Sequence, residues 1–369
     1  MVVKQFILCY NKLLLRRFIM MKAHLDRMMN MNLSDLISSL NIVEIQGEID
    51  HVHIHDVQMD SRHIQNGDLF VCIHGFTVDG HQFVPQAVKN GAVAILSERT
   101  LNVSVPVIVV SDTSRALAKI AARFYHYPTN DISLIGVTGT NGKTTVTYLL
   151  EEIFKHHGHQ TGLIGTIQMK IGDQSYPLKN TTPDALFLQK SFAQMKQANV
   201  ETAMMEVSSH ALDLGRVHGC DFDVAVFTNL SQDHLDYHET MENYAYTKSL
   251  LFAQLGNAYD GKKHKFAIIN ADDPACALMK KATSQHVLTY GCDREAHVMA
   301  KNIRSEVTAT SFTLVTPKGT LDIKSPLIGM FNVYNMLAAS SAAIALNVPL
   351  RTIKEALENI PGVPGRFEP

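Results

Sequence analysis

A short glycine-rich segment has the composition and placement of a phosphate-binding loop. It lies between the apolar run 132–138 and a helix predicted from residue 144 to about 157, and it reads Gly139, Thr140, Asn141, Gly142, Lys143, Thr144, Thr145. Glycines let the backbone approach phosphate oxygens, and amides at a helix start attract an anion. Lys143 would then reach the β- and γ-phosphates of a nucleotide, and the Thr144 hydroxyl suits Mg²⁺. The general pattern requires glycine where this chain has Val137, so an ordinary glycine-rich turn is the alternative.

Two further polar residues are placed to hold a metal ion beside that loop. Glu206 lies near the end of the apolar run 203–207, and His234 follows the next run, 223–227. Ligands of parallel sheets gather beyond the carboxyl ends of the strands. A carboxylate and an imidazole there could hold Mg²⁺, with water completing the shell, although oxygen is its usual ligand. Their spacing alone is more typical of ordinary loop residues than of metal ligands, and a lone helical lysine such as Lys248 is usually a solvated surface charge.

The loop from Thr138 to Thr144 resembles the nucleotide loop of the Mur ligases and their folylpolyglutamate synthetase relatives, whose first glycine stands where Gly139 does. The resemblance implies that the whole loop, Gly139 to Thr145, binds ATP. It also implies that Thr144, Glu206 and His234 are Mg²⁺ ligands, and that His234 and Lys143 serve catalysis. The helix around Lys248 is similar to the family segment whose lysine is carbamylated by CO₂ and supports a second Mg²⁺. The resemblance therefore implies that carbamylated Lys248 is both a metal ligand and a catalytic residue. Carbamylation requires a neutral amine and a nearby cation to stabilise its product.

The resemblance extends to residues that would bind the substrate. Asn180, Thr181 and Thr182 precede Pro183-Asp184, which by itself is an ordinary helix start. In the tripeptide-forming Mur ligases, a similar segment holds UDP-muramoyl dipeptide. The remaining positions carried over from the family are Ser208 and Arg216 for the same substrate, Ser61 for its uridine nucleotide, and Asn332 and Arg366 for ATP. Arginine can bind a carboxylate or phosphate through two hydrogen bonds. Ser61 and Asn332 could equally be an ordinary turn residue and a helix cap, respectively.

Composition indicates a globular protein without a strongly charged partner. The chain has 369 residues, 46% of them hydrophobic, which suggests two or three domains. A net charge of −2 gives no electrostatic reason to expect nucleic acid or membrane as a partner. Five separated cysteines without a CxxC pair are typical of reduced thiols in the cytosol. We therefore expect a cytoplasmic protein, and a monomer.

Strands alternating with helices predict an α/β fold with mainly parallel sheets. Residues 31–128 form a small α/β domain, which by the resemblance binds the UDP substrate, and Pro128-Thr129-Asn130 is interpreted as a linker. Residues 129–362 form the P-loop-type central domain that binds ATP, with an antiparallel ribbon at 297–323 and two closing helices. Residues 1–30 are interpreted as an extension or a misassigned start. Residues 363–369 resemble the hinge to a Rossmann-like third domain, which we expect to be absent.

The resemblance implies an ATP-dependent amide ligase of peptidoglycan precursor synthesis. By the resemblance, the enzyme adds meso-diaminopimelate or L-lysine to UDP-MurNAc-L-Ala-D-Glu through an acyl phosphate. Without a third domain, we expect the chain to bind ATP weakly and the UDP substrate detectably, and to complete little ligation. The alternatives are a sibling ligase such as folylpolyglutamate synthetase, or a non-catalytic nucleotide-binding fragment.

Overall fold

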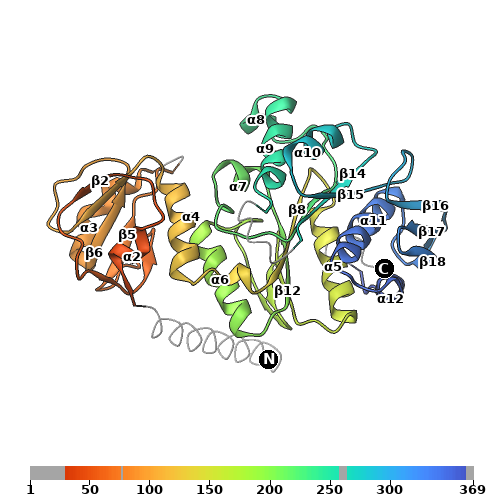
Figure 1. The fold of residues 1–369 in the computed structure, drawn as a ribbon, viewed down its shortest axis with the longest axis horizontal. Helices are drawn as coiled ribbons and strands as arrows, with labels where there is room; N and C mark the ends of the chain where they lie inside the picture. Colours follow the sequence, from red (N-terminus) through yellow and green to blue (C-terminus); the bar gives the residue numbers. More distant parts are fainter. Residues whose placement is uncertain (1–29, 76–77, 257–263, 363–369) are drawn as a thin grey trace, which may run out of the picture. The chain divides into compact units, whose positions relative to one another are not determined.

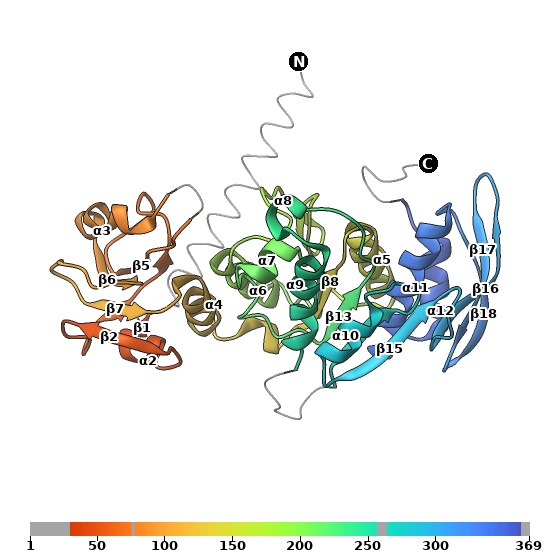
Figure 2. The same cartoon turned by 90° about the horizontal axis from the view of Figure 1, so that it is seen from above.

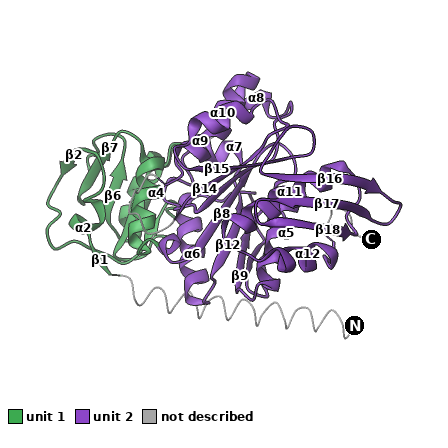
Figure 3. Ribbon diagram, turned by 45° about the vertical axis from the view of Figure 1, so that its right-hand side comes forward, with its two compact units in different colours: residues 1–127 green, residues 128–369 purple. Residues whose placement is uncertain are grey.

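The chain divides into two compact units, Met1–Tyr127 and Pro128–Pro369, shown in green and purple in Figure 3. The structure, a computed structural model, describes residues 30–75, 78–256 and 264–362. The segment interpreted as a linker lies at this boundary and forms a short 3₁₀ helix, η2 (Pro128–Asn130), in which Pro128 and Thr129 are buried. The proposed extension up to residue 29 and the hinge, 363–369, lie outside the described residues. Among those described, no helix is long and apolar enough to cross a lipid bilayer.

Unit 1 is built on a five-stranded sheet of order β2-β7-β6-β5-β4, in which β4 to β7 are parallel and β2 is antiparallel (Figure 1). Its strands are β2 (Ile42–Gln46), β4 (Val57–Gln58), β5 (Asp68–Val71), β6 (Ala92–Ser97) and β7 (Val107–Val110), with β1 (Met31–Asn32) and β3 (His53–Ile54) paired separately. Its helices are α2 (Leu33–Ile37), η1 (Gly80–Phe83), α3 (Val84–Asn90) and α4 (Thr113–Phe124).

Both faces of this small sheet are buried. On one face Phe70 and Ile95 pack with Ala87 of α3. Leu69 and Val71, whose side chains point to the opposite face because strand residues alternate, are also 0% exposed. A strand buried on both faces reads as a continuous apolar run, which is the pattern seen in the sequence of β5.

Unit 2 contains one large sheet of order β11-β10-β9-β12-β8-β13-β14-β15-β16-β17-β18. The strands from β9 to β16 in that order are parallel, whereas β10, β11, β17 and β18 are antiparallel to their neighbours. The strands are β8 (Ser133–Thr138), β9 (Thr161–Ile164), β10 (Met169–Ile171), β11 (Gln174–Tyr176), β12 (Thr202–Glu206), β13 (Val224–Phe227), β14 (Phe266–Asn270), β15 (His286–Gly291), β16 (Val298–Ser305), β17 (Thr310–Thr316) and β18 (Gly319–Ser325). This confirms the predicted parallel sheet and its antiparallel ribbon.

Helices cover both faces of the large sheet, and Figure 2 shows β16 to β18 at the end where α11 and α12 pack. The helices of unit 2 are α5 (Lys143–His156), α6 (Ala185–Gln197), α7 (Ser209–Asp213), α8 (Leu235–His238), α9 (Met241–Ala253), α10 (Cys276–Ala282), α11 (Met330–Ala345) and α12 (Leu350–Glu358). Successive side chains of β8 point to opposite faces of the sheet, so they belong to two separate parts of the core. Ile135 and Val137 pack with α5, α11 and α12 on one face. Leu134 packs with α6 and α9 on the other face.

The register of the central strands brings three loops to one edge of the sheet. Glu206, the last residue of β12, pairs with Val137 of β8, and Phe227 of β13 pairs with Thr138. All three strands run in parallel, so the segments that follow them leave the sheet at the same level. The phosphate loop, the Glu206 segment and the His234 segment therefore start side by side.

Candidate active site

The predicted phosphate loop connects β8 directly to α5, and its two glycines are required by space and by backbone conformation. Gly139 has φ +143°, and a Cβ there would lie 2.0 Å from Thr228 Oγ1. Gly142 has φ +88°, and a Cβ there would lie 2.4 Å from Asn335 Oδ1. The residue at the generic first-glycine position, Val137, is instead fully buried in β8. The loop thus departs from the generic glycine spacing because its tight turn starts at Gly139, two residues after the generic first-glycine position.

Lys143 folds back over the loop that precedes it. Its Nζ donates to the carbonyl oxygens of Gly139, at 2.8 Å, and Thr140, at 2.9 Å. Because Lys143 opens α5, its charge lies beside the unsatisfied amides of a helix start, where an anion is stabilised. This arrangement can bind a phosphate group.

Glu206 is buried against the start of the same helix. Its side chain is 1% exposed, and its two carboxylate oxygens each lie 3.0 Å from the Thr144 hydroxyl. They also accept from the Thr166 backbone N–H at 2.8 Å and the Thr166 hydroxyl at 3.1 Å. Gly165 leaves the necessary room, since a Cβ there would lie 2.4 Å from Glu206 Oε1. Thr166 was not identified from the sequence, which carries no signal for this contact.

The segment after β13 wraps around the phosphate loop. Asn229 accepts from the loop through two oxygens: its carbonyl accepts from Thr140 N at 2.8 Å, and its Oδ1 accepts from Asn141 N at 3.0 Å. The Thr140 hydroxyl lies 3.2 Å from Ser231 O and 3.0 Å from Ser231 N. The sequence placed this segment near the loop but did not single out Asn229 or Ser231 as its partners.

His234 follows in that segment and remains partly exposed. The backbone of His234 is left-handed, with φ +52°. Its side chain is 48% exposed, and its Nε2 lies 3.6 Å from Asp233 Oδ2. Its ring lies 5.1 Å from the His210 ring, centroid to centroid. Glu206 thus reaches the phosphate loop through Thr144, whereas the segment that carries His234 reaches it through Thr140 and Asn141.

The oxygen donors at this edge fit Mg²⁺ in type. The Glu206 carboxylate and the Thr144 hydroxyl are hard oxygen ligands, and this ion commonly takes one or two carboxylates plus water and phosphates. In the described part of the chain, no three His, Cys, Asp or Glu side chains are grouped closely enough to hold a metal ion by themselves. A metal here would therefore need ligands from a bound nucleotide and water.

Lys248 is not the solvated surface lysine that its helical position suggests. Its side chain is 1% exposed, and its Nζ donates to Gly139 O at 3.0 Å and lies 4.3 Å from the centroid of the Tyr244 ring. Burial, and then the charge of Lys143, hold the pKa of Lys248 well below its usual value. A lysine that favours the neutral amine beside another cation has the properties that carbamylation requires.

Four of the predicted substrate residues gather around the end of β12. The Thr182 hydroxyl donates to Glu206 O at 2.8 Å and accepts from Ser208 N at 3.0 Å, and Arg216 Nη1 donates to Thr182 O at 3.0 Å. The Thr181 and Thr166 hydroxyls lie 3.0 Å apart. Asn180 is exposed at the start of the segment. Ser208 also caps α7, since its Oγ accepts from Ala211 N.

A cavity of about 880 Å³ opens beside the phosphate loop. Phe331, Tyr334 and Asn335 of α11 line it, and Asn332 does not. Asn332 is buried, at 2% exposed, and its Oδ1 accepts a hydrogen bond from Asn335 Nδ2 at 3.3 Å. The other lining residues come from the phosphate loop and the ends of β13, β14 and β15: Asn141, Gly142, Thr145, Thr228, Asn229, Asn270, Asp272, Asp273, Pro274 and Tyr290. Arg366 lies outside the described residues.

The wall of this cavity is held by Asp272. Its carboxylate accepts from the backbone N–H groups of Cys292 at 2.6 Å and Arg294 at 2.7 Å, and from the Tyr334 hydroxyl at 2.8 Å. Although partial burial opposes ionisation, these bonds keep the pKa of Asp272 below its usual value. The charged carboxylate thus ties the segment after β15 to α11.

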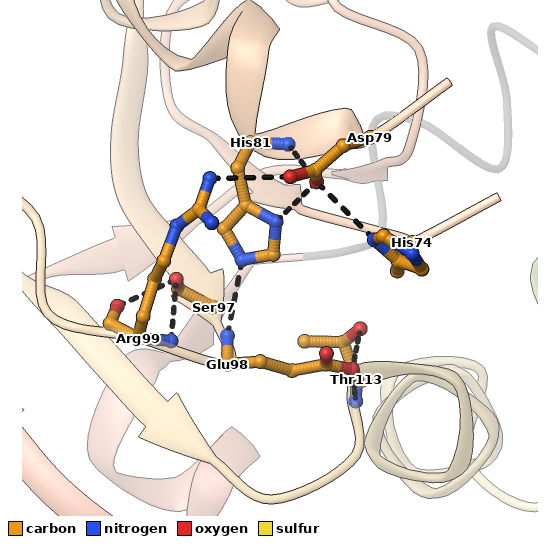
Figure 4. Close-up of polar contacts among 7 residues, drawn as sticks. All are labelled: His74, Asp79, His81, Ser97, Glu98, Arg99 and Thr113. Atoms are coloured by element: carbon orange, nitrogen blue, oxygen red, sulfur yellow. Dashed lines mark hydrogen bonds and ion pairs between the residues drawn. The ribbon is translucent and has the colours of Figure 1, made fainter. Parts of the chain in front are cut away.

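In unit 1, Ser61 follows β4, at the carboxyl edge of the small sheet. It is 6% exposed, and its carbonyl accepts from Asn90 Nδ2 at 2.8 Å. At the same edge, Asp79 accepts from the backbone and ring nitrogens of His81 and from Arg99 Nη2 (Figure 4). His81 Nε2 accepts from Glu98 N, so the ring proton lies on Nδ1. This network joins the segments that follow β5 and β6.

Comparison with protein families shows two matches. The Mur ligase middle domain matches residues 137–343, and the Mur ligase family catalytic domain matches residues 53–125. The two matches fall in unit 2 and unit 1 respectively.

Two similar proteins carry the same name. A protein of Oceanobacillus iheyensis is 58% identical over 92% of this chain and 69% of its own length, and one of Bacillus velezensis is 54% identical with the same coverage. Both are named UDP-N-acetylmuramoyl-L-alanyl-D-glutamate--2,6-diaminopimelate ligase. A solved structure of a ligase of that name superposes with a TM-score of 0.80 at 30% identity, covering 92% of this chain and 68% of that chain.

Proposed function

Because this chain belongs to the Mur ligase family, we propose that it is an ATP-dependent ligase that acts on UDP-N-acetylmuramoyl-L-alanyl-D-glutamate. The observation that carries the proposal is the contact between Thr144 and Glu206 beside Lys143, which joins an anion site to a buried carboxylate. The resemblance left the added amino acid open between diaminopimelate and L-lysine. The names of the similar proteins favour 2,6-diaminopimelate.

Each unit has its own part in the proposed reaction. Residues 31–128 bind the uridine nucleotide at the sheet edge that carries Ser61. Residues 129–362 bind ATP in the cavity beside the phosphate loop. The muramoyl dipeptide then contacts Asn180, Thr181, Thr182, Ser208 and Arg216, four of which surround the end of β12.

In the proposed reaction, the glutamate carboxylate of the substrate attacks the γ-phosphate of ATP and forms an acyl phosphate with release of ADP. Lys143 leaves the carbonyls of its own loop and neutralises charge on the phosphates. The amine of the incoming amino acid then displaces phosphate and forms the amide bond. Mg²⁺ held by Thr144, Glu206, His234 and carbamylated Lys248 would supply further neutralisation of the phosphates.

The proposal is tested by incubating the purified chain with ATP, Mg²⁺, the UDP-muramoyl dipeptide and 2,6-diaminopimelate. The expected result is weak binding of ATP and detectable binding of the UDP substrate by calorimetry, with slow release of ADP and a small amount of product heavier by one diaminopimelate residue by mass spectrometry. Parallel reactions with L-lysine, and with a folate substrate, test the acceptor and the sibling ligase. Lys143→Ala should lower the rate by about 100-fold or more, since it removes a group that stabilises developing charge. If the chain bound neither ATP nor the UDP substrate, the proposal would be refuted.

A further inference from the structure

A buried tyrosine on α9 contacts three of the proposed site residues at once. Tyr244 is 1% exposed, although its helix also carries strongly exposed positions such as Tyr246, at 62%. Its hydroxyl lies 3.3 Å from Thr140 Oγ1, and its ring centroid lies 4.3 Å from Lys248 Nζ and 6.1 Å from the His234 ring. None of the reasoning from sequence identified this residue.

The direction of the hydrogen bond to the phosphate loop follows from the other partners of Thr140. A hydroxyl donates one hydrogen bond and accepts two. The Thr140 hydroxyl donates to the carbonyl of Ser231 and accepts from the backbone N–H of Ser231. One acceptor site remains, so Tyr244 donates its proton to Thr140. Tyr244 is therefore the third partner that fixes the orientation of this loop hydroxyl.

The ring of Tyr244 also fixes the side chain of Lys248. The two residues are four apart on α9 and therefore lie on the same face of the helix. The lysine Nζ lies against the ring and donates to Gly139 O at 3.0 Å, the carbonyl that also accepts from Lys143 at 2.8 Å. Two lysine head groups thus share one loop carbonyl, and the Tyr244 ring lies against one of them.

We propose that Tyr244 is a positioning residue for the phosphotransfer site, holding the phosphate loop through Thr140 and the Lys248 side chain through its ring. This inference rests on the proposed function. Tyr244 itself touches neither nucleotide nor metal in this scheme. Tyr244 holds the Thr140 hydroxyl and the Lys248 amine in fixed positions relative to Lys143. Loss of Tyr244 therefore displaces both groups together.

The test compares substitutions at Tyr244 with the same substitutions at Tyr246 in the full chain. Tyr244→Phe removes only the hydroxyl and should weaken the binding of ATP with Mg²⁺ by about three- to tenfold, because one hydrogen bond to the loop is lost. Tyr244→Leu also removes the ring and should lower turnover by about 100-fold, the effect expected when site groups shift by about 1 Å. Affinity for the UDP substrate should stay unchanged in both. Tyr246→Phe and Tyr246→Leu should leave every value unchanged.

A double-mutant cycle separates positioning from a general effect on folding. Tyr244→Phe and Thr140→Val should be non-additive in ATP affinity, because both break the same bond, whereas Tyr246→Phe and Thr140→Val should be additive. If Tyr244→Phe bound ATP as the wild type does, or were additive with Thr140→Val, the inference would be wrong. Should Tyr244→Leu fail to fold, Tyr244→Phe alone still decides the question. If the wild-type chain bound no ATP, the proposed function would fail, and this inference with it.

Discussion

At the scale of single residues, the proposed site depends on the contact between Thr144 and Glu206, next to Lys143 at the start of α5. The Thr144 hydroxyl is the only group of α5 that the structure shows donating to the Glu206 carboxylate within the described residues. A buried carboxylate is stable only when it is paired or hydrogen-bonded, so this hydroxyl both supports Glu206 and sets its distance from the phosphate loop.

Substitution of Thr144 by valine tests that contact. Thr144→Val keeps the shape of the side chain but removes the bond to a charged carboxylate, which contributes about 1.5–3 kcal/mol. We expect the affinity for ATP with Mg²⁺, measured by calorimetry, to fall by about tenfold or more.

The matched control is Thr147→Val, one turn further along the same helix. The Thr147 hydroxyl is also buried, but it donates only to the backbone carbonyl of Thr144. This variant should bind ATP as the wild type does. Equal affinities for the two variants would show that the Thr144 hydroxyl has no role in nucleotide binding.

At the scale of elements, both units use the carboxyl edge of a parallel sheet to bring loops together. In unit 1, hydrogen bonds between polar side chains connect the loops at this edge. Asp79 accepts from the His81 ring, and the His81 ring accepts from the backbone N–H of Glu98. The Glu98 carboxylate in turn accepts from the backbone N–H and the hydroxyl of Thr113, at the start of α4. The segments after β5, β6 and β7 are thereby linked in sequence (Figure 4). Removing one of these side chains should increase the mobility of the segments after β5, β6 and β7.

This network predicts a pH dependence of stability. The backbone and ring nitrogens of His81 lower the pKa of Asp79 from 3.8 to about 2. A depressed carboxyl pKa contributes stability that is present above about pH 4 and is lost as the pH falls towards 2. Asp79→Asn should therefore lower the stability at neutral pH and flatten its decline between pH 4 and 2, measured by urea unfolding at each pH.

The control for this experiment is Asp50→Asn, an exposed position in the same unit. It should leave the profile of stability against pH as in the wild type. A slope for Asp79→Asn as steep as that of the wild type would mean that the Asp79 carboxylate contributes nothing to the acid sensitivity.

At the scale of the whole molecule, each unit has its own hydrophobic core. Unit 1 contains the cluster around Phe70 and Ile95, and unit 2 contains two clusters on the faces of its large sheet. Units with separate cores can unfold in separate transitions. The two proposed ligand sites are likewise on different units, with Ser61 on one and the phosphate loop on the other.

We therefore expect each ligand to stabilise one transition in calorimetry. At about 100 times its dissociation constant, a ligand stabilises the part that binds it by about 2.7 kcal/mol. UDP should raise the melting temperature of one transition, and ATP with Mg²⁺ that of the other. A single transition shifted equally by both ligands would contradict the assignment of one site to each unit.

The sequence by itself determined the features that depend on neighbouring residues. The apolar run ending at Thr138, the glycines after it and the helix expected from Thr144 predicted the phosphate loop between β8 and α5, because strand, turn and helix preferences are local. The antiparallel ribbon from β16 to β18 was predicted for the same reason, from its alternating pattern. Family resemblance, rather than spacing, singled out Glu206 and Lys248.

Only the tertiary structure decided which distant side chains meet. Thr166 joins Glu206, Tyr244 joins Thr140, and Asn335 rather than Asn332 lines the cavity, although no local pattern separates those two asparagines. These contacts follow from the strand order, which places β8 between β12 and β13, strands that lie far from it in the chain. Pairing between such strands is set by the packing of both sheet faces at once, so the pattern within any one segment cannot reveal it.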